Sequence, residues 1–172
     1  MVWMWIAWAL ILTFGIIAFR GAPYVPSRRR YINHAFTELY PLTKKDVLVD
    51  VGSGDGIVLR SARAVGAQAV GYELNPILVV ISRLLSRKDV GVYVRLADFW
   101  IAKLPDDVTV VYAFMATPYI HKLDAKMQNE TNRLCRPLRL ILYGNSLDKR
   151  TPDKASEGYR LYTFVPLQML KP

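Results

Sequence analysis

A single stretch, Val47–Gly56, constrains the fold of this chain more than any other part of the sequence. It begins as a short apolar run, continues into a glycine-rich turn and is followed by a helical pattern at residues 57–65. Gly52 and Gly54 tolerate positive φ angles and let the backbone approach a ligand closely. The helix that follows directs its N-terminal amides at that ligand and favours an anionic group there. This order predicts an α/β domain with a ligand site at the turn.

The rest of the chain alternates between apolar runs and helical patterns. Buried apolar strands that alternate with helices indicate a mainly parallel sheet, wound right-handed. An amphipathic helix is also expected between Ser27, a candidate N-cap, and Pro41, whereas residues 145–158 are polar and turn-rich. The predicted strands are Val47–Val51, Ala69–Leu74, Val90–Leu96, Val108–Met115, Leu138–Tyr143 and Arg160–Pro166, and the other predicted helices are 57–65, 76–86 and 119–134.

The N-terminal segment, residues 2–19, carries no charge and is almost entirely apolar. A helix of this length spans about 27 Å, close to the thickness of a bilayer core. A cleaved signal peptide would have a base before the run and a small-residue cleavage site after it, but Phe19 and Arg20 follow here. A buried core helix is the other alternative. We therefore predict a transmembrane anchor at 1–20, a Pro-rich linker at 21–27 and a catalytic domain at 28–172.

Basic residues follow the apolar segment and outnumber the acids around them. The positive-inside rule then predicts a single-pass membrane protein with its domain on the cytosolic or mitochondrial matrix side. A basic collar would also attract anionic lipid head groups, although a solvated helix face explains the same residues. Nucleic acid is not an expected partner, because no aromatic stacking motif accompanies the bases. The bases are Arg20, Arg28, Arg29, Arg30, Lys44 and Lys45, and the acids are Glu38 and Asp46.

Metal-ligating residues are sparse. Cys135 is the only cysteine, so the chain forms no internal disulfide and offers no set of thiolate ligands. His34 and His121 are isolated and lack the spacing of metal ligands. No metal site is predicted.

Acidic residues end the strands that surround the glycine turn. A dinucleotide site has its third glycine three residues after the second, whereas Gly56 follows Gly54 by two. Asp50 lies just before the turn, where its carboxylate can accept hydrogen bonds from a ligand ammonium. Glu73 ends the second strand and can accept both hydroxyls of a ribose. Asp98 ends the third strand and can bind an adenine amino group.

These positions together match the parts of S-adenosylmethionine. Its methionine end would lie at the turn, its ribose at Glu73 and its adenine at Asp98, with the ring of Phe99 covering the base. The ligand would cross the carboxyl ends of the strands, as ligands do in open α/β sheets. NAD is the lesser alternative, because no second domain remains to hold a hydride acceptor.

The segment Asp50–Pro76, with its Gly-Ser-Gly-Asp-Gly and Gly-Tyr-Glu-Leu-Asn-Pro runs, resembles class I methyltransferases. More narrowly, it is similar to the membrane-anchored lysine methyltransferases of the ATP synthase c-subunit and the adenine nucleotide translocase. Pro23–Ser27 resembles their pre-domain motif, and Asp98–Trp100 resembles their Asp-Leu-Trp. The likeness spans about residues 23–166, but Ile57 replaces a family arginine. It implies a Rossmann-like fold and S-adenosylmethionine bound by Asp50, Gly52, Gly54, Gly56, Glu73, Asp98 and Phe99.

Two tyrosines are the candidates for contact with the methyl acceptor. Tyr24, in the linker, would orient an acceptor amine with its hydroxyl or its ring face. Tyr119 ends a Pro118-Tyr119 pair after the fourth strand, where class I enzymes that methylate nitrogen carry acceptor-binding residues. Plain packing explains either tyrosine equally. The predicted activity is methylation of lysine side chains on a membrane-associated protein. The alternatives are methylation of a lipid or hydrophobic small molecule, and a non-catalytic cofactor-binding module.

Overall fold

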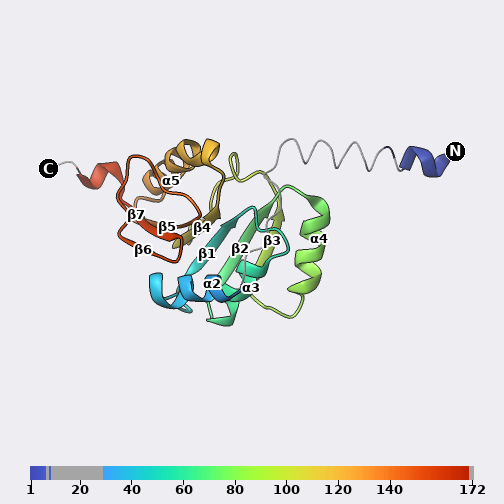
Figure 1. Ribbon diagram of the computed structural model, residues 1–172, viewed down its shortest axis with the longest axis horizontal. Coiled ribbons are helices and arrows are strands. Elements are labelled where there is room, and N and C mark those ends of the chain that lie inside the picture. Colours follow the sequence, from blue (N-terminus) through green and yellow to red (C-terminus); the bar gives the residue numbers. More distant parts are fainter. Residues whose placement is uncertain (7, 9–28, 171–172) are drawn as a thin grey trace.

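The chain is organised around one seven-stranded sheet, seen in the computed structural model, which describes residues 1–6, 8 and 29–170 (Figure 1). The strand order is β3-β2-β1-β4-β5-β7-β6. Strands β1 to β5 are parallel, and β7 runs antiparallel to both β5 and β6. The predicted, mainly parallel sheet is confirmed. The strands are β1 (Val47–Val51), β2 (Gln68–Glu73), β3 (Val92–Leu96), β4 (Val110–Phe114), β5 (Leu138–Tyr143), β6 (Lys154–Ser156) and β7 (Tyr159–Phe164).

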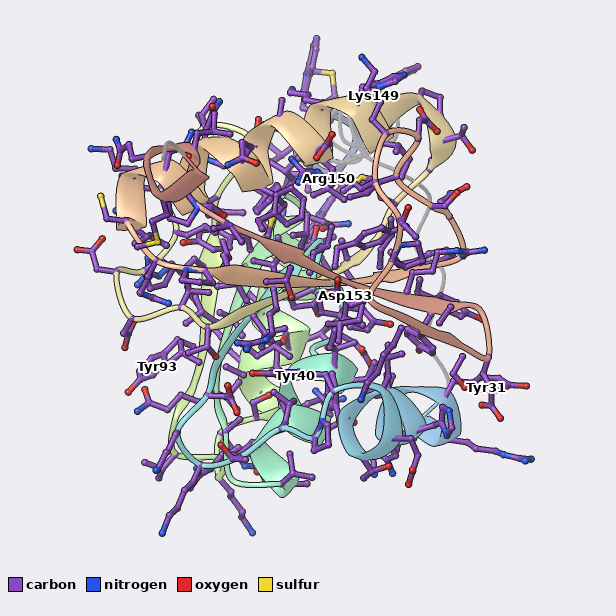
Figure 2. The ribbon with its side chains drawn as sticks, turned by 90° about the vertical axis from the view of Figure 1, so that its left-hand side faces the viewer. Tyr31, Tyr40, Tyr93, Lys149, Arg150 and Asp153 are labelled. Carbon is purple, nitrogen blue, oxygen red and sulfur yellow. The ribbon has the colours of Figure 1, made fainter. Side chains whose placement is uncertain are left out.

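Helices cover both faces of this sheet. Figure 2 shows α5 over one face, while α2 and α3 lie on the opposite face. Helix α4 lies with α3 on that second face, at the end of the sheet that carries β3 (Figure 1). The helices are α2 (Arg29–His34), the π-helix η1 (Ala35–Leu39), α3 (Ile57–Ala64), α4 (Pro76–Leu85), the 3₁₀ turn η2 (Thr117–Tyr119), α5 (Ile120–Leu134) and the 3₁₀ turn η3 (Leu167–Leu170).

The central strand β1 supplies both halves of the core. All five of its residues are buried, as expected for a strand covered by helices on both faces. Leu48 belongs to the cluster that includes Leu59 of α3, whereas Val49 belongs to the cluster that includes Leu123 of α5. This alternation follows from the two-residue period of a strand. Packing on both faces fixes the position of β1, so the glycine turn that follows it lies at the end of the sheet where the carboxyl ends of the parallel strands meet.

Local chemistry explains where several helices begin and end. The Asn75 side chain caps α4 by accepting the Ile77 N–H at 2.9 Å, and Pro76 stands at the first helical position. Helix α5 ends at Cys135, which adopts a left-handed conformation with φ of 52°. The helix expected between Ser27 and Pro41 is split, because α2 continues as the π-helix η1. Strand β6 lies in the stretch 145–158, for which only turns were expected.

The prediction of a single-pass membrane protein is wrong on this structure. Within residues 1–6, 8 and 29–170, no helix is both long and apolar enough to cross a membrane. The described part of the proposed anchor contains a short helix at residues 2–6, and the rest of residues 2–19 and the linker 21–27 lie outside the described residues. Lipid contact through that segment and the adjacent basic collar is likewise unsupported.

Candidate cofactor site at the carboxyl edge of the sheet

The turn after β1 is held against the end of β2. The N–H groups of Gly52 and Ser53 both donate to the Tyr72 carbonyl, at 2.9 and 3.0 Å. Gly52, Gly54 and Gly56 have φ angles of 73°, 54° and 79°, in the left-handed region that favours glycine. A Cβ atom added to Gly52 would meet no atom within 4 Å. The backbone here therefore borders open space that a ligand can enter.

Two glycines are instead required by close packing beneath the turn. A Cβ atom on Gly56 would overlap the hydroxyl of Ser82 in α4. A Cβ atom on Gly71, in β2, would overlap the Ser53 side chain and lie 2.7 Å from Leu59. The sequence does not predict this role for Gly71, because no residue near it in the chain indicates that the glycine turn packs against it.

Glu73 joins the end of β2 to the glycine turn. Its Oε2 atom accepts the Gly54 N–H at 2.9 Å, and its Oε1 atom accepts the Asn75 N–H at 2.8 Å. Each carboxylate oxygen has a second lone pair that remains available for a ligand hydroxyl. The residue predicted to bind ribose therefore lies directly beside the turn predicted to bind the methionine end.

Asp50 is a buried acid in a negatively charged setting. Its side chain is only 3% exposed, and burial raises the pKa of its carboxyl well above the ordinary value. The charges of Glu73 and Asp55 raise that pKa further, while a backbone hydrogen bond from Val51 opposes the rise. A cation bound nearby would reverse this penalty, because opposite charge favours the ionised carboxylate. The three acids therefore suit a ligand that carries an ammonium and a sulfonium.

The third strand brings an acid and two aromatic rings to the same edge. The Oδ1 atom of Asp98 accepts the Trp100 N–H at 2.8 Å, which fixes the turn after β3. Phe99 is buried and packs edge-on against Tyr72 and Trp100, with ring centroids 6.3 and 5.3 Å apart. Trp100 is only partly buried. It is the more accessible of the two adjacent rings, whereas the sequence predicts that Phe99 covers the adenine.

Tyr119 lies on the surface next to Trp100. The two rings stack with centroids 6.1 Å apart and an interplanar angle of 28°. The Lys122 ammonium lies 4.5 Å from the centroid of the Trp100 ring. Tyr119 thus joins the turn after β3 to the start of α5. Tyr24, the other predicted catalytic tyrosine, lies outside the described residues.

Asn145 is a further candidate site residue that no pattern in the sequence indicates. It follows β5, and its Nδ2 atom donates to the Met115 carbonyl at 2.6 Å. Its Oδ1 atom accepts the Thr117 hydroxyl at 3.3 Å. The sequence shows Ala116 and Thr117 after β4, where nitrogen methyltransferases often carry an acid or amide. The structure supplies a side-chain amide at that place from the neighbouring strand.

The residues at this edge fit S-adenosylmethionine. Gly52 borders open space, Glu73 keeps free lone pairs, and Asp50 lies in a negative field that a cationic ligand relieves. Among the described residues, no group of three or more His, Cys, Asp or Glu side chains could hold a metal ion.

Comparisons with known proteins identify methyltransferases as relatives of this chain. No family model matches the chain. It is 35% identical over 117 residues to the ATP synthase c-subunit lysine N-methyltransferase of Xenopus laevis, an alignment that covers 66% of this chain and 50% of the relative. It is 34% identical over 130 residues to the adenine nucleotide translocase lysine N-methyltransferase of Mus musculus, covering 72% and 56%. The chain spans about half the length of these curated relatives.

A solved structure is similar over nearly the whole domain. The RNA methyltransferase of Salinibacter ruber, in complex with S-adenosylhomocysteine, aligns with a TM-score of 0.72 and 27% identity, covering 83% of this chain and 94% of that one. This chain has the class I methyltransferase fold. Its curated homologues are lysine methyltransferases of the ATP synthase c-subunit and the adenine nucleotide translocase, which confirms the resemblance noted in the sequence. The bound product in the Salinibacter enzyme belongs to the cofactor class that the edge described above fits.

Proposed function

We propose that this chain is an S-adenosylmethionine-dependent methyltransferase that N-methylates lysine side chains of a membrane protein. The observation that carries the proposal is the contact between Glu73 and the Gly54 amide, which joins the expected ribose and methionine positions in one continuous edge. The homology to two lysine methyltransferases supports the acceptor, since both relatives act on lysine of another protein. Because the chain spans about half of each relative, its activity and its acceptor are proposals.

The residues of the edge have distinct roles in cofactor binding. The turn formed by Gly52, Gly54 and Gly56 lets the methionine end approach the backbone closely at the start of α3, whose dipole favours its carboxylate, and Asp50 favours its ammonium. Glu73 accepts the ribose hydroxyls, and Asp98 accepts from the adenine amino group. Phe99, buried beneath Trp100, supports the wall against which the adenine lies. The cofactor supplies an electrophilic methyl group on its sulfonium.

The acceptor amine must approach that methyl group aligned and unprotonated. Holding the two reactants in line is the main contribution that such a site makes. A lysine amine with an ordinary pKa near 10.4 loses its proton more readily in an apolar or cationic setting. The stacked rings of Trp100 and Tyr119, with Lys122 beside them, offer such a setting. We assign Tyr119, together with Tyr24 of the linker, to orienting the amine.

The direct test is transfer of a labelled methyl group. The full chain and its Glu73→Gln variant are incubated with labelled S-adenosylmethionine and membranes from the source cell, and Glu38→Gln serves as an exposed, matched control. We expect label on a discrete protein band, released as methyl-lysine on acid hydrolysis. The Glu38→Gln variant should retain this label, and the Glu73→Gln variant should lose most of it.

Three other outcomes would each reject the lysine assignment. Label in extracted lipid alone would indicate a lipid or hydrophobic small-molecule acceptor. Label in RNA, measured in a parallel reaction, would align the chain with its Salinibacter structural relative instead. Cofactor binding by calorimetry with no transfer to protein, lipid or RNA would indicate a non-catalytic binding module.

A further inference from the structure

Helix α4 is inverted with respect to the usual amphipathic pattern. Its large aliphatic residues recur at spacings of three, four, seven and eight, which ordinarily marks the face that packs on the core. Here that face points to solvent, and its members are between 39% and 58% exposed. We call it the α4 apolar face. It consists of Ile77, Val80, Ile81, Leu84 and Leu85.

The opposite side of α4, which packs on the sheet, is polar by comparison. It carries Val79, Ser82 and Ser86, all buried. The hydroxyls of both serines have no hydrogen-bond partner among the described residues. The helix therefore buries small polar side chains and exposes large apolar ones. Since exposed apolar patches of this kind often mark interaction surfaces, the α4 apolar face is a candidate docking surface.

The charged side chains closest to this face in the sequence are mostly basic: Arg83 lies on α4, and Arg87 and Lys88 lie in the turn that follows and precede Asp89. At 100° per residue, Arg83 lies along one flank of the apolar stripe, while Arg87 and Lys88 lie just beyond its carboxyl end. No acidic residue occurs between Pro76 and Lys88. The chain as a whole carries a formal net charge of +9. A second copy of the chain would bring like charges together, whereas an anionic surface would complement them.

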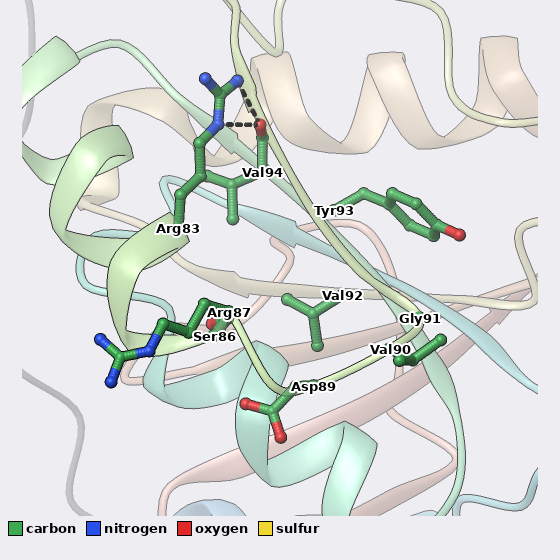
Figure 3. A pocket seen from close by; sticks show the side chains of 9 residues that line it. All are labelled: Arg83, Ser86, Arg87, Asp89, Val90, Gly91, Val92, Tyr93 and Val94. Carbon is green, nitrogen blue, oxygen red and sulfur yellow. Dashed lines mark hydrogen bonds between the residues drawn. The ribbon is translucent and has the colours of Figure 1, made fainter.

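Arg83 is held in place at the border of the face. Its Nε and Nη2 atoms donate to the Val94 carbonyl at 3.1 and 2.7 Å (Figure 3). Figure 3 also shows the Arg87 guanidinium extending away from β3. The recess beside them, about 310 Å³ in volume, lies toward the amino end of β3 and is separate from the cofactor edge. The basic border is thus one fixed and one outward-pointing guanidinium beside the apolar stripe.

We propose that the α4 apolar face docks on an anionic lipid surface. A helix with an apolar face bordered by Lys and Arg lies in the plane of a bilayer interface, with its apolar side chains among the lipid chains. This contact needs no helix that crosses the bilayer and is independent of residues 2–19. Because α4 begins three residues after Glu73, docking places the cofactor edge close to the lipid surface. It does not depend on the identity of the methyl acceptor.

The test reads the environment of α4 itself. In a full chain with Cys135→Ser, an environment-sensitive fluorophore is attached to a cysteine introduced as L84C. The matched control carries the same fluorophore at N129C, an exposed position on α5, which lies over the opposite face of the sheet. Both proteins are mixed with vesicles of phosphatidylcholine alone, or of phosphatidylcholine and phosphatidylglycerol in equal amounts. Thermal unfolding before labelling establishes that both variants are folded.

We expect a blue shift and a rise in emission at position 84 with the anionic vesicles, and no change at position 129. Arg87→Gln with Lys88→Gln should weaken the response at position 84 by about 25-fold in apparent vesicle affinity, at about fivefold for each base. No response at position 84 on any vesicle would overturn the proposal. So would equal responses at both positions, or a response independent of lipid charge. A shift that appears on concentrating the protein without vesicles would assign the face to a second copy instead.

Discussion

Glu73 and Gly54 are joined by a hydrogen bond of 2.9 Å from the Gly54 amide to the Glu73 carboxylate. The contact closes a ring from the end of β1, through the glycine turn, to the end of β2. The same carboxylate accepts the Asn75 N–H, so one side chain also fixes the start of α4. A ligand that binds Glu73 therefore meets a backbone already arranged to receive its other end.

The first prediction concerns Glu73. Glu73→Gln keeps the size of the side chain but removes its charge and one acceptor oxygen. Hydrogen bonds to a charged group contribute about 1.5–3 kcal/mol, so we expect S-adenosylmethionine affinity to fall about 10- to 100-fold. Isothermal titration calorimetry measures the change, and Glu38→Gln is the control. Unchanged affinity in Glu73→Gln would mean that this carboxylate does not contact the cofactor.

The second prediction separates binding from stability at Asp50. Asp50→Asn removes a charge that burial and two acidic neighbours disfavour. We expect the cofactor-free protein to gain about 1–2 kcal/mol in unfolding free energy at neutral pH, while cofactor affinity falls. Urea unfolding and calorimetry measure the two quantities. Loss of both stability and binding would show that the Asp50 charge is compensated within the protein itself.

The pH dependence of the Asp50 effect has a definite sign. The folded pKa lies above the unfolded value, near 3.8, so the folded state binds this proton more tightly. Its stabilising contribution is complete below the unfolded pKa and is lost as the pH rises through the folded pKa. The advantage of Asp50→Asn should therefore grow with pH across that window. An advantage that is constant with pH would contradict the assignment.

Local patterns in the sequence were sufficient to predict the strands and the glycine turn that meet at the candidate cofactor edge but not their surroundings, and the role of these residues in cofactor binding stays a prediction. One short stretch of sequence contains β1 with Asp50, the glycine turn and, at the end of β2, Glu73. Local backbone preferences are strong enough to predict structure within such a stretch. Asn145 lies thirty residues after Met115, and no local pattern indicates that their turns meet. Helix α4 shows the opposite difficulty: the Asn75-Pro76 cap locates the start of the helix correctly, but nothing in the sequence indicates that its apolar face is exposed, because a periodic pattern carries no information about what covers that face.

The third prediction concerns Asn145. Asn145→Ala removes the donor to the Met115 carbonyl and the acceptor of the Thr117 hydroxyl, and should lower stability by about 1 kcal/mol. We expect cofactor affinity to stay near the wild-type value, because the glycine turn is untouched. Methyl transfer should fall, through a higher KM for the acceptor. Steady-state kinetics with varied acceptor measures this, and Asn129→Ala on α5 is the control. A loss confined to cofactor affinity would mean that Asn145 acts on the cofactor and not on the acceptor, which contradicts the prediction.

The fourth prediction concerns Asp46, which lies at the amino end of β1, away from the cofactor edge. Burial opposes ionisation of its carboxyl, but hydrogen bonds from Thr109, Thr43 and Tyr40 outweigh burial and hold its pKa below the ordinary value. Burial, together with Asp46, raises the pKa of Tyr40 to about 12. Asp46→Asn should therefore destabilise the fold at pH 7 by about 1.5–3 kcal/mol. Cofactor affinity should be unchanged, which sets this variant apart from Asp50→Asn.

Acid should erase the difference between the wild type and Asp46→Asn. For a carboxyl whose folded pKa is lowered, the stabilising contribution is complete above the unfolded pKa, here 3.8, and is lost as the pH falls through the folded pKa. Urea unfolding of both proteins from neutral pH down to about pH 3 should show a full gap at pH 7 that narrows below the unfolded pKa. A gap that stays constant down to acid pH would mean that Asp46 acts through shape and neutral hydrogen bonds, because only the ionised carboxylate gives the contribution its dependence on pH.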